Sequence, residues 1–252
     1  MKPDVRRLKM LDYARGFAIL CMMFFHSFQF YEGDLGEVAQ NMSSSPIKSI
    51  FKFFGRWAGL FVMISGTAFA YVNSHRLNEN KITPKKMVKE TVGFGLILIF
   101  VERLTRLFFA STSRGGGAYG YDQGPYHYSM VVGSLETGTF QAPSLYNILY
   151  KMGAVTAIAL SLMFLSLLMA LFYHEGETKI TSTEFYVLGL VGSFFVLYSG
   201  FFVEMFRPRW LEYMKNGNVF LALLSGCFVG DIHALFPLLG YALYGAMFGF
   251  AF

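Results

Sequence analysis

The chain has 252 residues, of which 54% are hydrophobic and only 15% are charged, and its mean hydropathy is +0.45. Charged residues make up about a quarter of an average soluble domain, so this composition excludes an ordinary soluble protein and is typical of a membrane protein. The net charge of +5 is concentrated in two stretches, which indicates membrane topology rather than nucleic-acid binding. The two cysteines, Cys21 and Cys227, lie in apolar runs and fit neither a disulfide framework nor a metal motif.

Stretches of about 20 mostly apolar residues are long enough to cross a bilayer as helices. By this criterion, the sequence predicts an all-α, polytopic transmembrane bundle of about six to seven spans, forming one domain over residues 1–252. The expected spans are 12–31, 50–73, 88–110, 148–173, 183–206 and 235–252. The apolar stretch 216–230 is shorter, so it fits a re-entrant piece, an interfacial helix or a seventh span.

Two groups of basic residues predict the orientation of the first spans. The N-terminal tail contains Lys2, Arg6, Arg7 and Lys9, and the segment after the second span contains Arg76, Lys81, Lys85, Lys86 and Lys89. Cytoplasmic segments are enriched in Lys and Arg, so we expect an integral, multi-pass membrane protein with a cytoplasmic N-terminus. The charges after residue 174 fit this rule less well, and the topology of that part stays open.

One long connection, 111–147, separates the third and fourth spans. It is rich in Gly and Tyr and too polar to cross a membrane. Connections of this length are often lids or binding loops. A surface loop without a function is the alternative.

The first predicted span contains three ionisable residues, and ionisable groups inside a bilayer are costly and usually functional. Arg15 and His26 are eleven residues apart, so a helix places them on one face, about 16.5 Å apart along its axis. Asp12 precedes Arg15 by three residues and lies near the same face. We expect this face to contact protein or water. In the alternative, Asp12 and Arg15 pair at the membrane interface and His26 is a packing residue.

The third predicted span also contains charged residues, which are Glu102, Arg103 and Arg106. Glu102 lies about 18 Å along the helix axis from Glu90, the charged residue that precedes it. This places Glu102 at a depth in the membrane similar to that of His26. Glu102 can pair with Arg106 at i, i+4. Arg56, at the outer end of the second span, belongs to the same layer. These residues predict a polar pocket in the outer half of the membrane, unless the third span ends early and leaves its charges in water.

Such a pocket has a definite chemistry. A neutral imidazole is a competent general base for a hydroxyl or amine that attacks an acyl group. Neighbouring arginines can hold an anionic substrate or stabilise a developing oxyanion. The same groups can relay protons or bind ions in a transporter, and spacing alone does not decide between these roles.

Four sequence blocks resemble the transmembrane acyltransferases. "LDYARGFAILCMMFFH" resembles their first span, and in the acyltransferase-3 branch an Arg and a His with ten residues between them form a motif, matched by Arg15 and His26. "FKFFGRWAGLFVMISGTAFAY" is similar to a second-span block of the branch related to heparan-α-glucosaminide N-acetyltransferase. The matching positions are Arg56, Phe61, Ser65 and Gly66.

Two later blocks follow in the family's order. "SLYNILYKMGAVTAIAL" is similar to the start of a later span, and "ALFPLLGYALYGAMFG" is similar to the block "FPLxPWLGxxLxG" but lacks its Pro-Trp pair. Together the four blocks extend over most of the chain. Family members usually have more spans, so the resemblance fits a truncated, a minimal or an inactive member.

The resemblance implies transfer of an acyl group, typically acetyl, from cytoplasmic acetyl-CoA to a hydroxyl or amine of a sugar-type acceptor across the membrane. It implies that His26 is the catalytic base and that Arg15 and Asp12 bind the donor or shape the site. Lys85 and Lys86 would join Arg15 in a basic mouth suited to the CoA phosphates. The candidates for acceptor binding, oxyanion stabilisation or orientation of the histidine are Glu102, Arg103, Arg106 and Arg56. Direct transfer and an acyl-histidine intermediate both stay open.

Two other functions compete with the acyltransferase. The same intramembrane groups would line the path of a transporter or channel, or the chain would be an inactive, structural member of the family. The expected partners are membrane lipid, acyl-CoA and a carbohydrate or other acceptor, with no metal and no nucleic acid. A homo-oligomer is neither required nor excluded by the sequence.

Overall fold

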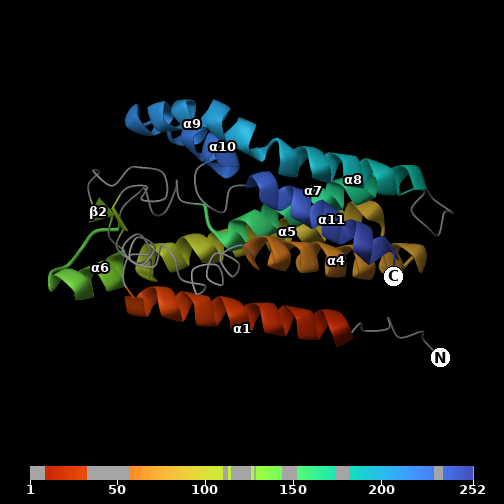
Figure 1. Ribbon diagram of the computed structural model, residues 1–252, viewed down its shortest axis with the longest axis horizontal. Coiled ribbons are helices and arrows are strands. Elements are labelled where there is room, and N and C mark those ends of the chain that lie inside the picture. Colours follow the sequence, from red (N-terminus) through yellow and green to blue (C-terminus); the bar gives the residue numbers. More distant parts are fainter. Residues whose placement is uncertain are drawn as a thin grey trace, which may run out of the picture.

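The computed structural model describes residues 9–32, 57–109, 113–114, 126–127, 129–143, 152–173, 182–229 and 235–251 (Figure 1). These residues form nine helices and one short strand pair, so the prediction of a helical bundle is confirmed for the described part of the chain. The helices are α1 (Lys9–Glu32), α4 (Trp57–Asn78), α5 (Pro84–Phe109), α6 (Met130–Thr137), α7 (Ala154–Phe172), α8 (Ser182–Leu197), α9 (Ser199–Lys215), α10 (Val219–Val229) and α11 (Leu235–Ala251).

Helix α11 forms the centre of the bundle and packs along α4. Small residues make this contact close. A Cβ atom at Gly245 would overlap the backbone of Met63, and one at Gly249 would overlap the backbone of Thr67. Glycines four residues apart, as here, let two helices approach closely, which is the usual way in which helices associate inside a membrane.

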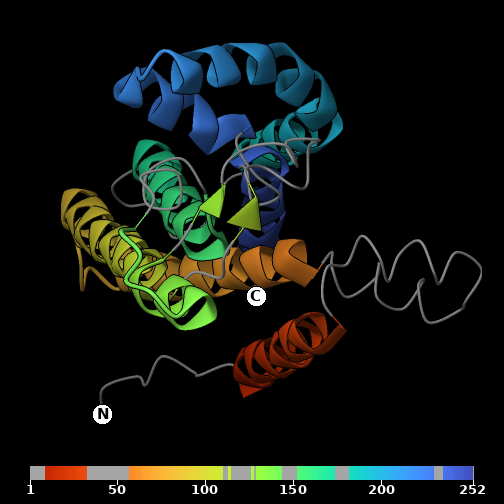
Figure 2. The same cartoon turned by 90° about the vertical axis from the view of Figure 1, so that its left-hand side faces the viewer.

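The other sides of the bundle are formed by α5, α7 and α8. Helix α7 packs against both α5 and α11, and α8 also packs against α11. Between α8 and α11, the hydroxyl groups of Ser193 and Tyr244 are 2.7 Å apart and share a hydrogen bond. Helix α1 packs against α4, on the side away from α8 and α9 (Figures 1 and 2).

The start of α1, at Lys9, and the second group of basic residues lie at one end of the bundle, which we call the basic end. Helix α1 begins there, and the turn between α4 and α5 lies at the same end (Figure 1). Helices α4 and α7 are joined there by a 3.3 Å hydrogen bond from the Tyr173 hydroxyl to the Leu77 carbonyl. This arrangement agrees with placing Lys9 and the second group of basic residues on one side of a membrane. The number of spans and the side on which the N-terminus lies stay predictions.

The expected span 183–206 is not one helix. Helix α8 ends at Leu197, and α9 starts at Ser199 and leaves at an angle of 54°. The Ser199 hydroxyl donates to the Val196 carbonyl at 2.8 Å, and Gly200 follows directly. Ser–Gly pairs are a common cause of sharp bends in helices, which explains the break.

The opposite end of the bundle contains α9, α10 and the described part of the long connection (Figure 1). The ring of Phe236 stacks there on the rings of Phe195, Phe202 and Phe228, which joins α8, α9, α10 and α11. In the long connection, β1 (Ser113–Arg114) pairs antiparallel with β2 (Tyr126–His127), and α6 packs against α5. The connection therefore contains regular structure, while its role as a lid stays a prediction.

Length and apolarity single out one described helix, α7, as able to cross a membrane. Helices α8 and α9 pass the same criterion only when taken together, and α10 and α11 are shorter apolar helices. Helices α1, α4 and α5 correspond to the first three expected spans, each with different ends. The short stretch 216–230 corresponds to α10, which packs against α9.

Candidate functional site

Helix α1 has two different sides. The exposed side carries a stripe of large apolar residues, which are Met10, Tyr13, Phe17 and Leu20. The other side includes Ala18, which is 3% exposed, and Arg15, which is half-buried. Because α1 packs against α4, the backbone register places position 15 on the side that faces protein. Asp12 is exposed and lies near the start of the helix.

His26 is the predicted catalytic residue. Its backbone belongs to α1, and the register places position 26 on the same side of the helix as position 15. Its side chain lies outside the described residues, as does the whole of Arg56. Their roles therefore stay predictions.

Glu102 lies near the end of α5, and its side chain is only 9% exposed. Its Oε1 atom accepts a 2.8 Å hydrogen bond from Nε of Arg106, one helical turn further on. Its Oε2 atom accepts a 2.5 Å hydrogen bond from the backbone N–H of Thr156, the third residue of α7. The first N–H groups of a helix have no partner within that helix. Glu102 therefore caps α7 from a neighbouring helix.

The sequence just before α7 explains why a cap from another helix is needed. The N-cap residue is Gly153, which has no side chain that could accept a hydrogen bond from the first N–H groups of α7. A Cβ atom at this position would overlap Oε1 of Glu102 and Nη2 of Arg106. The absence of a side chain at Gly153 thus admits the ion pair to the helix start. The positive end of the α7 dipole also favours a carboxylate there.

The predicted pocket residues do not all meet in one interface. Glu102 and Arg106 come together at the contact of α5 with α7, whereas Arg15 belongs to α1, which packs against α4. Arg103, between the paired residues in sequence, is partly buried. Whether any of them contacts a substrate or the histidine stays a prediction.

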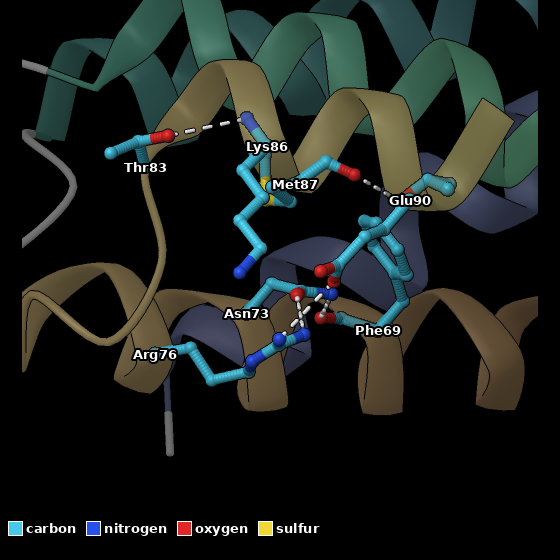
Figure 3. Close-up of polar contacts among 8 residues, drawn as sticks. Phe69, Asn73, Arg76, Thr83, Lys86, Met87 and Glu90 are labelled. Carbon is cyan, nitrogen blue, oxygen red and sulfur yellow. Dashed lines mark hydrogen bonds and ion pairs between the residues drawn. The ribbon is translucent and has the colours of Figure 1, made fainter. Parts of the chain in front are cut away.

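A second polar network lies at the basic end, between α4 and α5 (Figure 3). Arg76 donates to the Asn73 side-chain oxygen at 3.3 Å and to Glu90 at 3.2 Å. The Asn73 amide group in turn donates to the Phe69 carbonyl at 3.0 Å. Lys86 extends from α5 toward this network in the figure. These contacts hold the end of α4 to the start of α5.

Helix α5 begins with its own cap. The Thr83 hydroxyl accepts a 3.3 Å hydrogen bond from the backbone N–H of Lys86, and Pro84 occupies the first position of the helix. Thr at the N-cap followed by Pro is a common helix start. Thr83, Pro84 and the backbone of Lys86 therefore fix the residue at which α5 starts.

Among the residues that the structure describes, no group of three or more His, Cys, Asp or Glu side chains could hold a metal ion. Sequence reasoning identified Glu102 and Arg106 as a pair but missed their partners Gly153 and Thr156. The available signal was the lack of Ser, Thr, Asp or Asn directly before the apolar run of α7, which leaves that helix start in need of a cap.

The family model described as heparan-alpha-glucosaminide N-acetyltransferase, catalytic, matches residues 7–114. The matched region runs from α1 through α5 to β1 and contains Arg15, His26 and Glu102. No curated protein and no solved structure matches the chain. Through residues 7–114, the chain's resemblance to the transmembrane acyltransferase superfamily, in its heparan-α-glucosaminide N-acetyltransferase branch, is confirmed.

Proposed function

We propose that this protein is a membrane-embedded acyltransferase. It moves an acyl group, typically acetyl, from cytoplasmic acyl-CoA to a hydroxyl or amine of a sugar-type acceptor on the other side of the membrane. The observation that carries the proposal is the family match over residues 7–114, because that region includes the whole of α1 with Arg15 and His26. The register of α1 adds support, since both positions lie on the side that faces α4.

In the proposed reaction, the imidazole of His26 takes the proton from the acceptor hydroxyl or amine. The acceptor oxygen or nitrogen then attacks the thioester carbonyl carbon, and the carbon–sulfur bond breaks. The CoA sulfur leaves and receives the proton from the imidazolium. An acylated acceptor and free CoA result, and the histidine returns to its neutral form.

The two ends of α1 suit access from opposite sides. The helix has 24 residues, a length of about 36 Å, which exceeds the roughly 30 Å hydrocarbon core of a bilayer. Arg15 lies nearer the basic end, where an anionic donor would enter. Position 26 lies about 16.5 Å further along the axis, toward the side from which an acceptor would come.

The test uses the full chain purified in detergent and incubated with acetyl-CoA that carries a labelled acetyl group. Specific binding that excess CoA abolishes, followed by transfer of label to an amino sugar or a hydroxyl acceptor, is the expected result. Failure to bind acetyl-CoA in a folded sample would contradict the proposal. Binding with movement of a solute or ions across proteoliposomes, but without transfer, would favour a transporter.

Arg15→Ala should weaken binding of the donor, because the substitution removes a half-buried positive charge from the donor's side of α1. The measurement is the acetyl-CoA concentration at half-maximal turnover, compared with that of Arg209→Ala on α9 as a matched loss of an exposed arginine. An unchanged donor affinity and unchanged turnover in Arg15→Ala would leave Arg15 without a role in the site.

A further inference from the structure

Helix α5 has one face that no other described helix covers. Its residues follow each other at helical spacing along the length of the helix, and large apolar side chains make up most of it. They are Phe94, Leu96, Ile97, Phe100, Val101 and Leu104, with exposed fractions between 39% and 62%. Lys85, Lys86 and Lys89 lie in the first turns of the same helix, at the basic end of the bundle.

The charges at this end do not balance. Glu90 pairs with Arg76, and Glu79 pairs with Lys81. The three lysines of α5 are exposed and form no ion pair within the described part of the chain; they are Lys85, Lys86 and Lys89. The start of α5 therefore has an excess of positive charge, next to the exposed apolar face of the same helix.

The rotation of α5 about its axis is fixed by the opposite face. Met87 is 1% exposed, Gly95 packs against Met163 of α7, and Glu102 caps α7. These contacts follow α5 from its start to its end. The apolar face therefore points away from the other helices that the structure describes.

The apolar face of α5 is longer than one bilayer leaflet and shorter than the whole hydrocarbon core. Leu104 lies fifteen residues beyond Lys89, about 22 Å along the axis, which fits within the roughly 30 Å hydrocarbon core. With the apolar side chains in the hydrocarbon, the lysines lie at the level of the lipid headgroups, where long basic side chains reach the phosphates.

We infer that the exposed face of α5 binds anionic phospholipid, with Lys85, Lys86 and Lys89 contacting the headgroup phosphate and the apolar side chains contacting the acyl chains. Charge complementarity selects this occupant, because each lysine near an anionic lipid surface adds to binding. The inference rests on the membrane location in the proposed function and does not require acyl transfer.

The test is native mass spectrometry of the full chain released from micelles that contain equimolar phosphatidylglycerol and phosphatidylcholine. The wild type should retain phosphatidylglycerol in excess. Replacing the three lysines by glutamine should reduce that excess by about fivefold or more, the effect of at least one lysine at an anionic surface. The charge-matched change of all three to arginine should keep it. Arg209→Gln with Lys215→Gln, two exposed basic residues on α9, serves as the control and should also keep it.

Three outcomes would overturn the inference. In the first, the glutamine variant, with an unchanged melting temperature, retains the same excess of phosphatidylglycerol. In the second, CoA displaces the lipid from the wild type at concentrations that saturate donor binding, which would assign the lysines to the donor. In the third, a dimer forms at the expense of lipid adducts, which would assign the face to a second copy. A chain that retains phosphatidylglycerol but transfers no acetyl group would contradict only the acyltransferase proposal.

Discussion

Helix α5 takes part in two Arg–Glu pairs, one near each end, and they differ in nearly every physical respect. At the basic end, Arg76 and Glu90 meet at 3.2 Å with side chains that are 36% and 47% exposed. At the opposite end, Glu102 and Arg106 meet at 2.8 Å with side chains that are 9% and 18% exposed. The first pair joins α4 to α5, whereas the second pair also caps the start of α7.

Neither the charges of the two pairs nor the spacing of their residues in the sequence reveals which pair matters for stability. An exposed pair contributes little because water competes for both charges. A buried pair costs desolvation energy when it forms, but removal of one partner leaves a buried charge that nothing compensates. Glu102 additionally supplies a hydrogen-bond acceptor that the sequence of α7 lacks.

The largest expected effect is that of Glu102→Ala. This change leaves the partly buried Arg106 without its ion-pair partner and removes the acceptor that caps the start of α7. It should therefore lower the free energy of unfolding by about 3–5 kcal/mol. Glu102→Gln keeps an acceptor for the Thr156 N–H group and should fall between this variant and the wild type. The measurement is thermal unfolding in detergent, with Glu204→Ala on α9 as an exposed control. A Glu102→Ala protein as stable as the control variant would contradict the capping role.

Gly153→Ala should have the next largest effect. The new Cβ atom would overlap Glu102 and Arg106, so the ion pair must move away from the helix start, at a cost of about 1–3 kcal/mol. Gly93→Ala is the matched control, because a Cβ atom there meets nothing within 4 Å. Replacing a glycine inside a helix without a clash should stabilise the protein by about 0.5–1 kcal/mol. Equal melting temperatures for the two variants would show that Gly153 is not tightly packed.

The smallest effect is expected for Glu90→Gln at the basic end. The loss of an exposed ion pair should change the free energy of unfolding by less than about 1 kcal/mol. The same thermal unfolding experiment measures it, at low and at high salt, because salt screens an exposed pair and should narrow the difference from the wild type. A loss as large as that of Glu102→Ala would mean that burial does not separate the two pairs.

Much of the helical framework could be predicted from local patterns. The apolar run of α7 predicted a helix, since 148–173 contains the observed Ala154–Phe172. The eleven-residue spacing of Arg15 and His26 predicted their common face from helix geometry alone. The basic residues of the tail and of the α4–α5 turn were expected on one side, and the start of α1 at Lys9 and the α4–α5 turn do lie at one end.

What local patterns could not give are the contacts between distant segments. The i, i+4 spacing indicated that Glu102 pairs with Arg106, but nothing in that spacing shows that Thr156, 54 residues away, donates to the same carboxylate. Likewise, the apolar stretch 183–206 reads as one span, and the bend at Tyr198 depends on a local serine hydrogen bond. The choice of α4 as the partner of α1 is a property of the whole bundle.

The most direct test of the central claim compares His26→Gln with His26→Ala and the wild type, measuring melting temperature in detergent and acetyl transfer in the same samples. Glutamine keeps much of the shape and a polar tip but cannot accept a proton at neutral pH. Both variants should bind acetyl-CoA, His26→Gln should be the more stable of the two, and both should lose about 10²–10⁴-fold in turnover. A His26→Gln protein that transfers acetyl groups at the wild-type rate would contradict the assignment of His26 as the base.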